Sequence, residues 1–459
     1  MKSIPELVAS HKAFFLSQGT KDVSYRLLLL KALKQEIIKK EQDIFDALYN
    51  DFRKSEFETY ISEFGLVISE LNLAIKKLKT WSRPKRVRAS ILTFPSKDYI
   101  YKVPYGSVLV IAPWNYPFLL AMNPLIMAIA AGNTVVLKPS ELTENTSKVL
   151  TKIIKNVFPE DVCTSIEGGI PLATALLAQK WDYIFFTGST KVGKIVAEAA
   201  AKHLTPVTLE LGGKSPCIID DTIDVKLIAR RLVWGKLLNG GQTCIAPDFV
   251  IVKSSIKANL VNAIKKEITR RYSEDIFQSG DFPRIINSKN LKRLVSLIEN
   301  ESIIFGGEID EKTNYLSPTL VDSPKLDSKI MTEEIFGPIL PILAYEAEKD
   351  IAKILNGIER PLAFYVFSKN KSFYSKIITT YNFGGGVIND PLIHFGNSKL
   401  PFGGIGASGM GNYHGIHGFD TFSHKKAIMK RGTWLDLPLR YAPYKGKINL
   451  LKTIFKYFG

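Results

Sequence analysis

The feature that most constrains the fold is an alternation of short apolar runs and longer amphipathic runs between residues 107 and 211. Short β-branched and aromatic runs are typical of buried strands, and apolar residues at three- and four-residue spacing are typical of helices. This alternation predicts a doubly wound parallel sheet, whose ligands bind at the carboxyl ends of its strands. The expected strands are Ser107–Ala112, Thr134–Leu137, Val162–Glu167, Tyr183–Thr187 and Pro206–Leu211, and the expected helices are Phe118–Ala131, Asn145–Val157, Pro171–Gln179 and Val192–His203.

The rest of the chain supplies further domains, because 459 residues exceed the roughly 250–300 that a single core serves. The first hundred residues predict amphipathic helices over Tyr25–Asn50 and Ser55–Trp81. A second alternating segment spans residues 224–389. Its expected strands are Phe249–Lys253, Ile339–Tyr345, Leu362–Ser368 and Gly385–Asn389. No repeat or low-complexity linker separates these parts, so we expect them to pack closely.

The net charge of +17 is concentrated at the two ends of the chain. Residues 1–102 contribute +7 and residues 421–459 contribute +8, whereas the 318 residues between them contribute +2. Because a nucleic-acid-binding protein needs a basic stripe on its working domain, we predict no nucleic-acid partner. A solvated surface is the favoured interpretation, and contact with an anionic membrane is the alternative.

A long uncharged stretch, residues 103–137, has the length of a membrane span but contains four prolines. It reads better as strand, turn, helix and strand inside a protein core. The chain begins with no signal-peptide pattern, and three cysteines are too few for a disulfide framework. These observations predict a cytoplasmic protein.

Two glycine patterns compete as a nucleotide-binding loop. Residues 404–409 satisfy G-x-G-x-x-G, but the flanking residues predict neither a strand before it nor a helix after it, so we reject this pattern. Residues 188–193 fail the literal pattern, yet they follow an apolar strand and open a helix, where backbone N–H groups can face a pyrophosphate. An ordinary strand–helix turn explains them equally well. Residues 213–215 resemble the end of a P-loop, but Thr208 occupies the position of its required glycine.

Three side chains predict covalent chemistry on a carbonyl group. Cys244 follows a flexible turn with two glycines, whereas Cys163 and Cys217 lie in apolar runs and are expected to be inert. Glu210 ends an apolar strand, where burial raises the pKa of a carboxyl group and suits it to act as a general base. Asn115 follows the first strand of the sheet, from which its amide can reach a reacting carbonyl. Together they supply a nucleophile, a base and a hydrogen-bond donor.

Seven short motifs, in this order, resemble those of the aldehyde dehydrogenase superfamily. They are Pro113-Trp114-Asn115, Lys138-Pro139-Ser140-Glu141, Phe186-Thr187-Gly188-Ser189, Leu209-Glu210-Leu211-Gly212-Gly213-Lys214, Gly241-Gln242-Thr243-Cys244, Glu334-Ile335-Phe336-Gly337-Pro338 and Pro401-Phe402-Gly403-Gly404. The resemblance covers residues 104–444. Residues 244–248, 413–422 and 439–441 are most similar to the class 3 branch, which acts on fatty and aromatic aldehydes.

The resemblance implies NAD- or NADP-dependent oxidation of an aldehyde, of medium or long aliphatic chain or aromatic, to a carboxylic acid. Cys244 would attack the aldehyde, Asn115 and the Cys244 N–H would hold the oxyanion, and Glu210 would activate the water that hydrolyses the thioester. It also implies cofactor contacts from Trp114, Lys138, Glu141, Gly188, Ser189, Gly193, Glu334 and Phe336, and a substrate pocket that includes Tyr116, Trp234 and Thr243. We expect no metal, because His414 and His417 lack acidic or cysteine partners nearby.

The implied architecture is an α/β fold with a Rossmann-like cofactor domain, a second α/β catalytic domain and a small bridging or oligomerisation element. The cofactor domain is expected over residues 1–85 and 105–211, the catalytic domain over 212–397, and the bridging segments over 86–104 and 398–459. The resemblance suggests a homodimer. The basic, apolar C-terminal tail is too short to span a bilayer, and our hypothesis is weak peripheral membrane contact.

Three alternatives remain at this stage. An acylating dehydrogenase would pass the thioester to coenzyme A or phosphate and normally lacks the base, so Glu210 argues against it. A cysteine hydrolase needs a histidine partner and no nicotinamide. A noncatalytic binding protein would keep its function without the Cys244 thiol.

Overall fold

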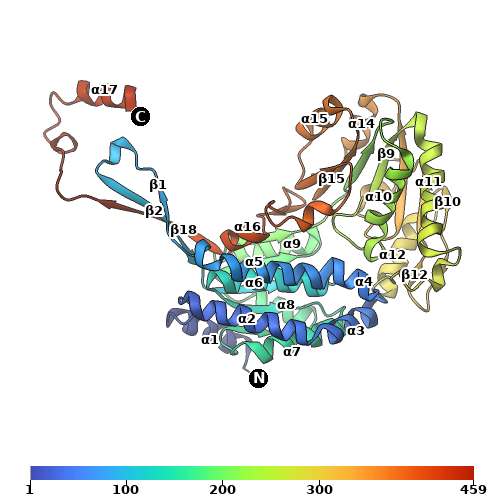
Figure 1. Cartoon of the computed structure of the whole chain (residues 1–459), viewed down its shortest axis with the longest axis horizontal. Helices are drawn as coiled ribbons and strands as arrows, with labels where there is room; N and C mark the ends of the chain where they lie inside the picture. The colour runs from blue at the N-terminus through green and yellow to red at the C-terminus, as the bar shows by residue number, and fades with distance from the viewer. Residues whose placement is uncertain (1, 459) are drawn as a thin grey trace.

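The computed structural model describes residues 2–458, and its first core is a six-stranded sheet (Figure 1). The strand order is β17-β7-β6-β3-β4-β5, with five parallel strands and an antiparallel β17. The strands are β3 (Ser107–Ile111), β4 (Thr134–Lys138), β5 (Cys163–Ser165), β6 (Tyr183–Thr187), β7 (Val207–Glu210) and β17 (Gly409–Met410). All five strands that the sequence predicts in this region are confirmed, to within three residues at either end.

Both faces of this sheet are buried, as a parallel sheet requires. Val108 and Val110 belong to one hydrophobic cluster, whereas Leu109 and Ile111 belong to another, so alternate residues of one strand face opposite cores. The first cluster includes α6 (Pro117–Ala131) and α7 (Glu144–Val157). The second includes α1 (Ile4–Leu16), α8 (Ile170–Leu177) and α9 (Thr190–Ala201).

A seven-stranded sheet forms the second core, with strand order β10-β13-β14-β9-β8-β15-β16. All neighbours are parallel except β10 and β13. The strands are β8 (Pro216–Ile219), β9 (Phe249–Lys253), β10 (Ile303–Phe305), β13 (Thr319–Asp322), β14 (Ile339–Tyr345), β15 (Ala363–Phe367) and β16 (Gly385–Ile388), and a separate hairpin joins β11 (Ile309–Asp310) to β12 (Tyr315–Leu316). The covering helices are α10 (Val225–Leu237), α11 (Ser254–Tyr272), α12 (Ser288–Ile298), α13 (Lys329–Thr332), α14 (Glu348–Leu355) and α15 (Lys371–Thr380).

The N-terminal helices lie along the first core (Figure 1). The single helix expected over residues 25–50 is wrong: α2 (Val23–Lys39) ends and α3 (Glu41–Phe52) begins around Lys40, whose backbone leaves the helical region. The second expected helix is also interrupted, since α4 (Glu56–Thr59) leads into a π-helical turn, η1 (Tyr60–Phe64), before α5 (Gly65–Trp81). Insertions of this kind re-aim side chains and recur at functional sites.

A three-stranded antiparallel sheet projects from the body and ends in the C-terminal helix (Figure 1). It consists of β1 (Lys85–Val87), β2 (Ser96–Pro104) and β18 (Ser423–Arg431). β2 and β18 pair along nine residues, from Ser423 opposite Pro104 to Arg431 opposite Ser96. The tip carries α17 (Ile448–Phe458). Across the described residues, none of the helices has the length and apolar character needed to cross a membrane.

The glycine-rich segment after residue 400 packs against the cofactor-side core. Residues 404–409 form a loop that gives only the two-residue strand β17, so they have no strand–turn–helix context. The expectation that residues 410–418 are too rich in glycine for a helix is wrong, because α16 (Gly415–Thr421) begins there. The Gly415 N–H donates a hydrogen bond to the buried carboxylate of Glu70, which stabilises the start of this short helix.

Candidate active site

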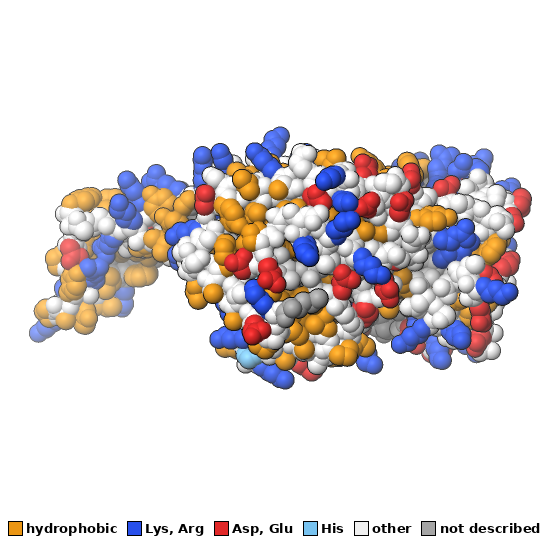
Figure 2. Space-filling model, turned by 90° about the horizontal axis from the view of Figure 1, so that it is seen from below, with side chains coloured by type: hydrophobic (Ala, Val, Ile, Leu, Met, Phe, Trp, Pro, Cys, Tyr) orange, Lys and Arg blue, Asp and Glu red, His pale blue; other side chains and the backbone are white. Residues whose placement is uncertain are grey.

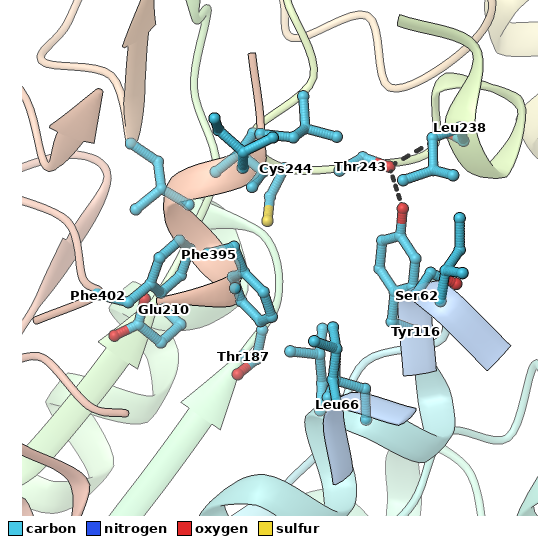
Figure 3. A pocket seen from close by; sticks show the side chains of 18 of the residues that line it. Ser62, Leu66, Tyr116, Thr187, Glu210, Leu238, Thr243, Cys244, Phe395 and Phe402 are labelled. Atoms are coloured by element: carbon cyan, nitrogen blue, oxygen red, sulfur yellow. Dashed lines mark hydrogen bonds between the residues drawn. The ribbon is translucent and has the colours of Figure 1, made fainter. Parts of the chain in front are cut away.

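The main cavity lies between the two sheets and encloses about 290 Å³. Its wall combines Cys244, Glu210 and Thr187 with a largely apolar lining (Figure 3). The Cys244 sulfur points into the cavity, opposite Leu66 and Tyr116 (Figure 3). Other wall residues are Ile61, Leu119, Leu120, Trp234, Leu238, Leu392, Ile393, Phe395 and Phe402.

The turn that presents Cys244 has a left-handed backbone at three consecutive residues. Asn239, Gly240 and Gly241 have φ of 55°, 60° and 74°. A side chain on Gly241 would collide with the carbonyl oxygen of Gly337, so glycine is required there. Asn239 adopts this conformation without being glycine, so surrounding contacts must hold it.

A hydrogen-bond network holds this turn. The Asn239 amide donates to the Asn115 carbonyl (2.7 Å) and to the Gln242 carbonyl (3.2 Å), and the Gln242 side chain donates back to the Asn239 carbonyl (3.0 Å). The Gln242 side chain also donates to the carbonyl of Arg284 and accepts from the N–H of Ile286. The turn is therefore fastened to the loop that follows β3 and to the loop around residue 285.

The thiol of Cys244 is protonated in this environment at neutral pH. Burial raises its pKa, and the negative charges of Glu334 and Glu210 raise it further, whereas the N–H groups of Cys244 and Ile245 act in the opposite direction. The surroundings of Cys244 in the free enzyme therefore do not activate this thiol.

Glu210 ends β7 and faces the same cavity. It is buried, and neither of its carboxylate oxygens has a hydrogen-bond partner among the described residues. This burial raises the pKa of Glu210 well above its ordinary value. An unpaired buried carboxyl group in the wall of the same cavity as a thiol is available to exchange a proton.

Asn115 lies beside the cavity wall, and its amide donates to the Gln242 carbonyl (3.1 Å), two residues before Cys244. An amide has two N–H donors, so one hydrogen remains to hold a ligand. Its neighbour Tyr116 lies in the wall and shares a 2.6 Å hydrogen bond with Thr243 (Figure 3). The structure therefore brings Asn115, Tyr116, Thr243 and Cys244 together, with Trp234 of α10 in the same wall.

The residues expected to contact the cofactor lie along the edges of the two sheets. Lys138 ends β4 and forms an ion pair with Glu141, and Glu141 lines a second pocket with Ser140, Glu167 and Gly168. Gly188 follows β6, its N–H donates to the Glu210 carbonyl, and Ser189 caps α9. A side chain on Gly193 would meet Leu211, so glycine lets α9 approach this strand end closely.

Of the remaining three predicted cofactor residues, Trp114 lies in the loop after β3, whereas Glu334 and Phe336 belong to the segment that follows α13. The Glu334 carboxylate packs against Gly212 so closely that any side chain there would collide with it. Burial, with Asp248 nearby, raises the pKa of Glu334 to about 8. The Phe336 and Trp114 rings make an edge-to-face contact at 5.3 Å.

An ion pair that the motifs did not reveal fixes the segment that carries Glu334. Lys214 pairs with Asp248, and both side chains are buried. Lys214 also donates to the carbonyls of Ile330 (2.8 Å) and Glu333 (2.9 Å), while Asp248 accepts from the Ile335 N–H (2.9 Å). The Gly213-Lys214-Ser215 sequence, rejected as a P-loop, thus holds a loop of its own chain.

These features fit a nicotinamide dinucleotide. Small pockets lie at the carboxyl ends of β4 and β5 and beside Glu334, and the second is lined by Thr190, Gly212 and Gly213. The start of α9 lies between them, where helix N–H groups favour phosphate. No group of three or more histidine, cysteine or acidic side chains suited to a metal exists among the described residues.

The match to known proteins agrees with this geometry. A family model described as the aldehyde dehydrogenase family matches residues 2–428, and the chain belongs to that family. It is an NAD(P)-dependent oxidoreductase that acts on an aldehyde group.

Relatives and a solved structure define the branch. The chain is 46% identical to 4,4'-diaponeurosporen-aldehyde dehydrogenase of Staphylococcus aureus (strain NCTC 8325 / PS 47), over 99% of this chain and 100% of that protein. It is also 46% identical to aldehyde dehydrogenase family 3 member A2 of Pongo abelii, over 96% and 93% of the two chains. The structure matches the substrate-bound state of Staphylococcus aureus AldH with a TM-score of 0.97 at 46% identity, covering 99% and 100%. The class 3 resemblance is confirmed.

Proposed function

We propose that this enzyme oxidises apolar aldehydes through a covalent intermediate on Cys244. The observation that supports this most is the largely apolar cavity whose wall includes both Cys244 and the buried, unpaired Glu210. Glu210 takes the thiol proton of Cys244 and releases it to solvent. The resulting thiolate attacks the aldehyde carbon, so a C–S bond forms, the C=O π bond breaks and the carbonyl oxygen becomes an oxyanion. The Asn115 amide and the Cys244 N–H hold that oxyanion, and losing one such donor typically costs on the order of 100- to 1,000-fold in turnover.

A nicotinamide dinucleotide held in the cleft would supply the hydride acceptor that oxidation of the substrate carbon requires. The substrate then remains on Cys244 as a thioester. Glu210 takes a proton from a water molecule that attacks this thioester, the C–S bond breaks, and the carboxylic acid leaves with the Cys244 thiol restored. Burial raises the pKa of Glu210 well above its ordinary value, which makes it a stronger base than a solvated carboxylate and suits it to this role.

In this proposal, the two sides of the cleft bind different parts of the cofactor. Lys138 and Glu141 contact the adenosine ribose, and Gly188, Ser189 and Gly193 bring the start of α9 to the pyrophosphate. Glu334 anchors the other ribose, with Phe336 and Trp114 beside the nicotinamide. The ion pair between Lys138 and Glu141 places a cation and a carboxylate at one ribose, which supports use of both NAD and NADP.

The substrate class follows from the wall of the cavity. Leu66, Leu119, Leu120 and Leu238 offer no charge to a bound chain, and Tyr116, Trp234 and Thr243 line the same cavity as the Cys244 thiol. This supports medium- or long-chain aliphatic and aromatic aldehydes. A panel of aldehydes of increasing length, assayed with each cofactor, ranks them by kcat/KM. A preference for short, charged aldehydes would contradict the proposal.

The alternative activities differ in residues that the cavity displays. A cysteine hydrolase needs a histidine beside the thiol, and none of the described residues that line the cavity is a histidine. An acylating enzyme needs no base, whereas Glu210 lines the same cavity as Cys244. We predict that Cys244→Ala abolishes NAD(P)H formation but leaves cofactor affinity unchanged, with Cys217→Ala as control. Equal NAD(P)H formation by Cys244→Ala would refute the assignment.

The projecting sheet and tail support two further proposals. β16 and β18 are edge strands of their sheets, and pairing of such edges between two copies supports a homodimer. Light scattering, which measures the mass of the enzyme in solution, tests this proposal.

The C-terminal tail carries exposed apolar and basic side chains and few acidic ones (Figure 2). Exposed Trp434, Leu450 and Phe455, with Lys452 and Lys456, support peripheral contact with an anionic membrane. Equal co-sedimentation of full-length and tail-deleted enzyme with anionic vesicles would contradict this contact.

A further inference from the structure

A buried acid from the N-terminal helices reaches the turn that presents the nucleophile. Glu58 lies on α4, 181 residues before Asn239 in the chain, and its carboxylate accepts a 2.7 Å hydrogen bond from the Asn239 N–H. Only 8% of Glu58 is exposed, and Asn239 is fully buried. The contact therefore joins two parts of the fold at the base of the active site.

Asn239 transmits any displacement to both reacting groups. Its side chain holds the Asn115 carbonyl, and the Asn115 amide holds the Gln242 carbonyl next to the nucleophile. Because Asn239 has a left-handed backbone, its position depends on the contacts around it. Glu58 is the one among these contacts that comes from the N-terminal helices.

Burying an ionised carboxylate at this contact costs free energy. The pKa of Glu58 is raised to about 7, chiefly by burial and also by the negative charges of Glu63 and Asp281. Lys54 and the Asn239 N–H act in the opposite direction, but Lys54 is itself paired with the buried Glu63 at 2.7 Å. A glutamine would satisfy the same N–H without the cost of a buried charge. What the carboxylate adds is a stronger, charge-assisted bond to a strained turn.

We propose that Glu58 is a positioning residue for aldehyde oxidation, whose ionised carboxylate holds Asn239 and thereby sets the geometry between the Cys244 thiol and the Asn115 amide. This inference rests on the proposed roles of Cys244 and Asn115. The ionised form holds the turn more firmly than the protonated form, so the rate of the chemical step depends on the charge of a residue that touches neither substrate nor cofactor.

The test compares kcat for the wild type and Glu58→Gln between pH 6 and pH 8. We expect the ratio of wild type to variant to rise from about twofold at pH 6 to about tenfold at pH 8, because the wild-type carboxylate ionises over this range. The affinity for NAD(P)+ stays unchanged. Glu56→Gln, exposed on the same short helix, is the matched control and retains wild-type kcat at both pH values.

A second variant leaves the turn itself untouched. Asp281 is exposed, and its charge raises the pKa of Glu58, so Asp281→Asn shifts the rise of kcat to lower pH at low ionic strength. A ratio for Glu58→Gln that is the same at pH 6 and pH 8, or an unshifted rise in Asp281→Asn, would overturn the inference. Activity of Cys244→Ala would instead overturn the proposed function, so the two failures are distinguishable.

Discussion

Replacing Lys214 with methionine should weaken both the fold and cofactor binding. The substitution removes the hydrogen bonds to the carbonyls of Ile330 and Glu333 and leaves the buried carboxylate of Asp248 without its main cation. Breaking a buried pair in this way costs about 3–5 kcal/mol of stability. We expect the lower end, about 3 kcal/mol, because Asp248 keeps the Ile335 N–H and the buried Lys236 lies near enough to interact with it.

The same change loosens the segment that carries Glu334 and Phe336. We therefore expect the Kd for NAD(P)+ to rise on the order of tenfold, equivalent to about 1.4 kcal/mol, with a smaller change in kcat. Urea unfolding of the free enzyme measures the first effect, and fluorescence titration with cofactor measures the second.

A double variant separates charge from shape. In Lys214→Met/Asp248→Asn the amide keeps an acceptor for the Ile335 N–H and removes the unpaired charge, so we expect it to recover at least 1 kcal/mol relative to the single variant. Lys329→Met, an exposed lysine in the same segment, is the control. Wild-type stability and cofactor affinity in Lys214→Met, or no recovery in the double variant, would refute this reasoning.

Two further predictions concern the reacting groups. Glu210→Gln should give a burst of NAD(P)H followed by steady turnover at least on the order of 100-fold slower than that of the wild type. Mass spectrometry should then detect the acyl group on Cys244. Steady turnover at the wild-type rate would count against the role of Glu210 as base. Because burial raises the pKa of the Cys244 thiol, iodoacetamide should alkylate the cofactor-free enzyme faster with each step from pH 7 to pH 9.5; a plateau near pH 7 would show an activated thiolate instead. The buried Cys163 and Cys217 should stay unlabelled and serve as internal controls.

Local sequence patterns predicted the five parallel strands of the first sheet and β9, β14, β15 and β16 of the second, but not its strands β10 and β13. Tyr183–Thr187, Phe249–Lys253 and Ile339–Tyr345 match their predicted strands at both ends, because strands buried on both faces must be continuously apolar. The projecting sheet was not predicted from the sequence, because its strands are not continuously apolar. Its strand β18 is mostly exposed and basic, and only its pairing with β2, more than 300 residues earlier in the chain, makes it a strand.

The site residues also differ in whether the local sequence could reveal them. Motifs pointed to Cys244, Glu210 and Asn115, and the fold brings their loops together. The motifs did not point to Glu58. Its short acidic helix has the composition of a solvated surface, and its partner, the turn at Asn239, is 181 residues away in the chain. Lys214 belonged to a motif, yet its contacts with residues 330–333 could not be read from the chain, because nothing local specifies a partner more than 100 residues distant.

The protonated state of Cys244 has a consequence for the survival of the enzyme between turnovers. Peroxides oxidise thiolates far faster than thiols, and the sulfinic and sulfonic acids that follow are not restored by cellular thiols. A nucleophile kept neutral by burial and by two neighbouring acids is therefore a poor target while the cleft waits for its ligands. The surroundings that delay activation of Cys244 also protect it from oxidative damage.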